Sequence, residues 1–79
     1  MTTYKFTQTK EIANALNNVA KESFIVDFTN NPYLNQDYAV KCFHDRNDDS
    51  IAVSTIGWSG ASWFSNTFEG RAKAFEMLT

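Results

Sequence analysis

The sequence has a single cysteine, Cys42, and this excludes an intramolecular disulfide. Secreted domains of this size usually rely on about two to four disulfides for stability, so we expect the protein to reside in the cytoplasm. The N-terminus also lacks the basic start and apolar run of a secretory signal. The apolar runs within the predicted strands reach only three residues, as at residues 24–26, whereas a membrane-spanning helix needs about 20 apolar residues. We therefore expect no membrane partner.

An excess of basic residues is also missing. Seven Lys and Arg stand against nine Asp and Glu, which leaves a net charge of −2 and a pI near 5.1. Neutralising a phosphate backbone needs clustered cations, and the cations of this chain are scattered. The sequence therefore disfavours direct binding to nucleic acid. A single-stranded nucleic-acid-binding module stays as an alternative, because Trp and Tyr rings provide surfaces on which bases stack.

Residues that support catalysis or hold metals are scarce. His44 is the only histidine and shares one strand face with Cys42, whereas a structural zinc site takes about four ligands. The three glycines match neither a dinucleotide fingerprint nor a phosphate loop. Residues 57–61 approach the G-x-S-x-G pattern of hydrolases, in which the histidine follows the serine, but here His44 precedes Ser59. The sequence predicts no enzyme, no metal site and no cofactor.

What the chain does contain is enough apolar material for one core. Apolar residues make up 43% and charged residues 20% of the 79 residues, a balance typical of a folded domain and not of a disordered chain. Chains of this length bury a single core. We expect one domain over residues 1–79.

Two segments repeat apolar residues at the spacing of an amphipathic helix. The first begins at Thr9, which we expect to be the N-cap, and the second is capped by Asn66 or Thr67. The expected buried positions are Ile12, Leu16, Val19 and Ala20 in the first helix, and Phe68, Ala72, Phe75 and Leu78 in the second.

Between and before these helices, apolar and polar residues alternate as in half-buried strands. The segments are residues 23–29, 38–44, 51–58 and 61–65, with a weak edge strand at residues 3–6. The pattern predicts the order (β)αββββα. We expect an α+β fold with two layers, in which an antiparallel sheet of three to four strands packs against two helices.

Aromatic residues are more numerous than such a core comfortably buries, with seven Phe, three Tyr and two Trp. Two helices cover only one face of a small sheet, so we expect Tyr33, Trp58 and either Trp63 or Phe64 to reach solvent. Exposed Trp and Tyr dominate the binding energy of protein interfaces. The alternative is that both Trp side chains lie in the core or fold over a sheet edge.

The densest acidic cluster lies at residues 45–49 and contains Asp45, Asp48 and Asp49. It lacks the glycine and the distal glutamate of a calcium loop. It is either a solvated turn or a complement to a basic partner surface. The predicted partner-binding residues are Tyr33, Asp45, Asp48, Asp49, Trp58 and Trp63.

In its length, acidity, abundant Asn, short α+β pattern and lack of catalytic residues, the whole chain resembles the small inhibitors carried by phages and mobile elements, among them the anti-CRISPR proteins. No motif contributes to this resemblance. It implies a phage-encoded, non-enzymatic inhibitor in the host cytoplasm that occludes a bacterial nucleic-acid-handling complex. A net charge of −2 is weak for a nucleic-acid mimic, so aromatic contacts would supply much of the affinity. A third reading is a homodimer formed by pairing of a free strand edge.

Overall fold

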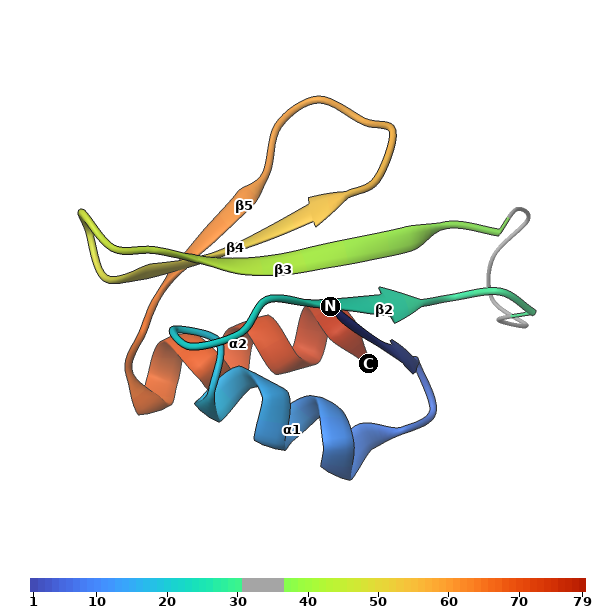
Figure 1. The fold of residues 1–79 in the computed structure, drawn as a ribbon, viewed down its shortest axis with the longest axis horizontal. Helices are drawn as coiled ribbons and strands as arrows, with labels where there is room; N and C mark the ends of the chain where they lie inside the picture. The colour runs from blue at the N-terminus through green and yellow to red at the C-terminus, as the bar shows by residue number, and fades with distance from the viewer. Residues whose placement is uncertain (31–36) are drawn as a thin grey trace.

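The computed structural model describes residues 1–30 and 37–79. The strands form one sheet in the order β1-β2-β3-β4-β5, and both helices lie on the same face of it (Figure 1). The predicted α+β class, element order and two-layer arrangement are confirmed. The elements are β1 (Thr2–Lys5), α1 (Thr9–Asn17), β2 (Phe24–Asp27), β3 (Ala39–Asp45), β4 (Ser50–Thr55), β5 (Ser62–Ser65) and α2 (Phe68–Leu78).

The sheet is mixed and has five strands, which corrects the expectation of three to four strands that are all antiparallel. β1 pairs with β2 in parallel, and the remaining pairs are antiparallel. The reason is that α1 connects β1 to β2. A parallel pair requires such a crossover, because a short turn reverses the direction of the chain.

The core lies between the sheet and the two helices. Phe24, Val26 and Phe28 alternate with more exposed neighbours and are all buried, as the period of two predicts. Phe28 stacks between Phe6 and Tyr38. The buried cluster comprises Ile12, Leu16, Val19, Phe24, Val26, Phe28, Val40, Cys42, Ile51, Val53, Ala74 and Leu78.

Helix α1 begins without a side-chain cap. Its N-cap is Gln8, and Thr9 is already the first helical residue, so the expected Thr9 cap is wrong. The Gln8 side chain instead accepts a hydrogen bond from the backbone N–H of Lys5, at 2.8 Å. Beyond the end of the helix, Val19 is buried as predicted, but Ala20 is exposed. The helix ends earlier than its apolar pattern, because Asn17 and Asn18 are poor helix formers.

Helix α2 is capped by Thr67, whose side-chain oxygen accepts a hydrogen bond from the backbone N–H of Gly70 at 3.1 Å. Its buried residues are Gly70, Ala74 and Leu78, whereas Phe68 is 83% exposed. The predicted helix face was therefore wrong for Phe68 and also for Ala72, which is exposed. Gly70 faces the sheet because the backbone of Ser65 in β5 contacts it directly and leaves no room for a side chain.

Neither helix is long and apolar enough to cross a bilayer, within the part of the chain that the structure describes.

Candidate protein-docking surfaces

The face of the sheet that points away from both helices, which we call the open face, carries a pair of aromatic rings. Phe43, Ala52 and Trp63 lie side by side on β3, β4 and β5. The Phe43 and Trp63 ring centroids are 6.0 Å apart at an interplanar angle of 83°, although their strands are about 10 Å apart. The two rings therefore lean together above Ala52, which is buried without any helix on this side. Trp63 itself remains 53% exposed.

The charges on the open face are balanced. The strand alternation places Lys5, Lys41, Asp27 and Asp45 on this side. The Lys41 ammonium lies 5.7 Å from the Phe43 ring centroid, which is cation–π distance. Hydrogen bonds from the Thr29 side chain and backbone hold the pKa of Asp27 below its usual range, so this carboxylate stays ionised near neutral pH. A neutral face of this kind has little attraction for a polyanion.

The loop between β4 and β5 presents Trp58, which is 69% exposed. Gly57 and Gly60 have φ angles of 90° and 88°, a region that favours glycine. Two hydrogen bonds also restrain the loop, from the Trp58 backbone N–H to the Thr55 carbonyl at 3.1 Å and from the Ser54 hydroxyl to the Gly60 carbonyl at 3.2 Å. The indole is therefore displayed on a restrained loop.

Beside Trp58 is a cleft of about 340 Å³ between this loop and the end of α2, which we call the Trp58 cleft. Met77 lies in its wall and is 50% exposed. None of the described residues that line the cleft is charged, and its wall combines the hydroxyl groups of Thr55, Ser59 and Ser62 with apolar side chains. The lining residues are Tyr38, Val40, Val53, Thr55, Trp58, Ser59, Gly60, Ala61, Ser62 and Met77.

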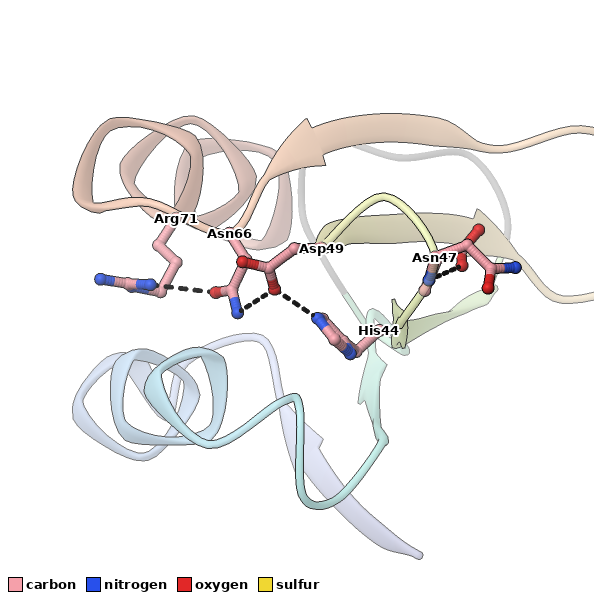
Figure 2. Close-up of polar contacts among 6 residues, drawn as sticks. His44, Asn47, Asp49, Asn66 and Arg71 are labelled. Atoms are coloured by element: carbon pink, nitrogen blue, oxygen red, sulfur yellow. Dashed lines mark hydrogen bonds and ion pairs between the residues drawn. The ribbon is translucent and has the colours of Figure 1, made fainter.

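The acidic turn between β3 and β4 contains a polar network that reaches α2 (Figure 2). The Asp49 carboxylate accepts hydrogen bonds from His44 Nε2 at 2.7 Å and from Asn66 Nδ2 at 3.1 Å. Arg71 donates to Asn66 Oδ1 at 2.9 Å. The hydrogen bond from His44, and after it that from Asn66, lowers the pKa of Asp49. Asp49 thus joins the turn to the N-terminal part of α2, which is a structural role.

The other two acids of this turn differ from Asp49. The Asp45 carboxylate accepts a hydrogen bond from the backbone N–H of Asn47 at 2.9 Å, which stabilises the turn. Asp48 is exposed. Of the three carboxylates, Asp49 is therefore the one most committed to holding the fold together.

The structure separates the residues that the sequence groups into one binding surface. Trp58 and the acidic turn lie at opposite ends of β4 (Figure 1). Trp63 belongs to the open face, whereas Trp58 borders a cleft that contains Val40 and Val53 of the helix-covered side. Tyr33 lies outside the described residues. Two contributors, Phe43 and Met77, were missed, although the alternation of residues 38–44 already places Phe43 opposite Cys42.

The described residues offer little for catalysis or metal binding. No group of three or more His, Cys, Asp or Glu side chains among them is close enough to hold a metal ion. Cys42 is completely buried, and burial raises the pKa of its thiol to about 12. A thiolate nucleophile at this position is therefore strongly disfavoured near neutral pH.

Exchanging Asp49 for Asn tests the network at the acidic turn. Asn has nearly the same shape and also tolerates the φ of 49° found here, so the variant removes the charge alone. Because the pKa of Asp49 is lowered on folding, its charge stabilises the protein above about pH 4 and this contribution is lost as the pH falls. We expect Asp49→Asn to melt below wild type at pH 7, with the gap narrowing as the pH falls below about 4.

Thermal melts followed by circular dichroism between pH 2.5 and 8 measure this gap. Asp48→Asn is the matched control, because it removes the same charge from the next residue outside the network. Equal melting temperatures of wild type and Asp49→Asn at pH 7 would contradict a stabilising role for the Asp49 charge.

Comparison with known proteins returned no match among protein-family models, curated proteins or solved structures.

Proposed function

We propose that this protein is a non-enzymatic protein-binding module that holds its partner at the Trp58 cleft. The observation that carries the proposal is a largely exposed Trp58 on a restrained loop, next to an uncharged cleft. Trp is among the residues most often found at binding hot spots. A loop that is already ordered loses less conformational entropy on binding, and Met77 adds an adaptable apolar contact.

The chemistry of the cleft favours a protein partner over a nucleic acid. Residues 54–63 contain no charged side chain, and the cleft lining has none either. Single-stranded nucleic acids bind where cations follow the backbone beside the stacking rings. An apolar side chain of a partner protein, inserted between Trp58 and Met77, matches this surface better.

The proposal extends to the class of partner that the resemblance to small phage inhibitors implies. In that reading, the protein is phage-encoded, acts in the host cytoplasm, and occludes a bacterial complex that handles nucleic acid, such as a CRISPR effector complex. Complexes of this class are therefore the first partners to test. The uncharged Trp58 cleft and its exposed indole ring, and not a dense negative surface, would provide most of the affinity.

Exchanging Trp58 for Ser tests the proposed contact. The immobilised protein is used to capture complexes from a bacterial lysate, and calorimetry then compares the affinity of the purified partner for wild type and variant. Loss of a hot-spot Trp costs about 2 kcal/mol or more, which is about 30-fold in affinity. We expect at least this loss, with an unchanged circular-dichroism melt, because Trp58 lies largely in solvent.

Phe68→Ser is the matched control, since it removes another exposed aromatic ring that lies away from the Trp58 cleft, on α2. Full affinity in Trp58→Ser would refute the proposed contact. Quenching of Trp fluorescence by a single-stranded oligonucleotide, with a steep salt dependence, would instead identify the nucleic-acid-binding alternative.

A further inference from the structure

We propose that two copies of this chain associate through their open faces around a two-fold axis, with Lys41 of each copy opposite Asp45 of the other. This interface is separate from the Trp58 cleft and does not depend on the function proposed for it. The proposal rests on the residue pattern of β3, on the neighbouring aromatic row and on the few free groups at the sheet edges.

The central strand carries a self-complementary pattern. β3 is the longest strand and lies in the middle of the sheet. Its open face presents Lys41, Phe43 and Asp45 in succession, about 7 Å apart. The order is positive, aromatic, negative, with Phe43 at the centre. A strand of this kind matches a second copy of itself when the two run in opposite directions.

Two open faces can stack around a two-fold axis that runs either along the strands or across them. The charges on β3 favour the second arrangement. An axis along the strands would place Lys41 opposite Lys41 and Asp45 opposite Asp45, so that like charges repel. An axis across the strands at Phe43 reverses the second β3 and places each Lys41 opposite an Asp45. In a two-fold interface this contact occurs twice, because each copy provides both members. Stacked sheets are about 10 Å apart, which the long Lys41 side chain can span with Asp45.

The apolar residues lie along this same axis. Phe43, Ala52 and Trp63 form one row across the sheet, so an axis along the row places each of them opposite its own copy. Trp63, which is 53% exposed in the single chain, would then lose its contact with water. The hydrophobic centre and the flanking ion pairs are therefore satisfied by one arrangement.

Pairing at the sheet edges, which the sequence suggested as a route to a homodimer, has less to offer. The edge strands β1 and β5 have four residues each. On β1, the backbone N–H of Lys5 is already used by the Gln8 side chain. Short edge strands are a common protection against strand pairing. The open face is the larger unused surface.

The expected dimer is reversible. Five strands about 4.8 Å apart and about five residues of overlap along β3 define a patch of roughly 400 Å² in projection for each copy. This is below the roughly 800 Å² per partner of a standard interface. The association should therefore depend on concentration.

Sedimentation velocity from about 5 to 500 µM, combined with charge exchange, tests the arrangement. We expect wild type to shift from 9.0 kDa toward twice this mass. Lys41→Glu and Asp45→Lys should each stay monomeric, because each places like charges opposite one another twice. An equimolar mixture of the two variants should associate again, since every opposed pair then has opposite signs.

Trp63→Ser provides a second variant that leaves the charges intact, and it should raise the dissociation constant of the dimer by about 10-fold or more. Trp58→Ser and Lys73→Glu, which lie outside the interface, should dimerise like wild type. Circular-dichroism melts confirm that each chain is folded. A wild-type monomer at 500 µM, or a mixture of Lys41→Glu and Asp45→Lys that does not associate, would overturn the proposal without affecting the test of Trp58.

Discussion

Exchanging Gly70 for Ala is expected to destabilise the protein by about 3 kcal/mol or more, at the upper end of the cost of overpacking. A Cβ atom at this position would overlap the Ser65 carbonyl group and contact the Ser65 hydroxyl. Helix propensity alone predicts the opposite sign, since Ala is favoured over Gly by about 1 kcal/mol. The overlap dominates because it involves the backbone of β5, which cannot move aside as a flexible side chain would.

A loss of 3 kcal/mol lowers the melting temperature of a domain of this size by about 12–24 °C, which circular dichroism measures directly. Ala72→Gly is the control on the same helix, because Ala72 is exposed. It should cost only about 1 kcal/mol through helix propensity. A Gly70→Ala variant more stable than wild type would show that α2 does not approach β5 as closely as described.

Exchanging Phe24 for Ala is expected to cost about 3–5 kcal/mol, the range for removing a buried Phe ring. Phe24 is 2% exposed, belongs to the core cluster and meets Tyr4 edge to face at 5.8 Å. A chain of 79 residues has a total stability of about 4–12 kcal/mol. The substitution thus removes a large part of the stability, and the variant should be partly unfolded at 37 °C.

Phe68→Ala is the matched control, since it deletes the same ring from a site that is 83% exposed. We expect its free energy of unfolding in urea to stay within about 0.5 kcal/mol of wild type. Similar losses for the Phe24 and Phe68 variants would mean that burial does not distinguish the two rings, contrary to the structure.

The two proposed surfaces are compatible with each other. The Trp58 cleft lies at the loop end of β4, whereas the proposed axis of the dimer passes along Phe43 and Trp63. A face-to-face dimer would carry two Trp58 clefts, and a partner with two matching sites would be held more tightly through effective concentration. Separate variants at Trp58 and Lys41 distinguish these contributions.

Part of the candidate site was predictable from local patterns. The alternation along β3 predicts that Phe43 and Cys42 point to opposite sides of the sheet. Because the helices cover only one side, Cys42 is buried and Phe43 is partly exposed. The position of Trp58 in a loop was not predicted, because the strand expected at residues 51–58 ends at Thr55 in the structure. Met77 in the cleft wall could not be predicted, because its contact with the loop depends on where α2 ends relative to β4.

Periodicity and composition were enough to predict the order of elements and the single core, because both act within individual segments of the chain. Tertiary structure decided the rest. The crossover through α1 makes β1 parallel to β2, and close contact with Ser65 turns Gly70 and not Phe68 toward the sheet. The hairpin geometry separates Trp58 from Trp63, and the network to Asn66 commits Asp49 to structure. The pairing of β1 with β2 and the Asp49–Asn66 hydrogen bond join segments distant in sequence, which no local pattern records, whereas the Ser65–Gly70 contact depends on the three-dimensional path from β5 into α2.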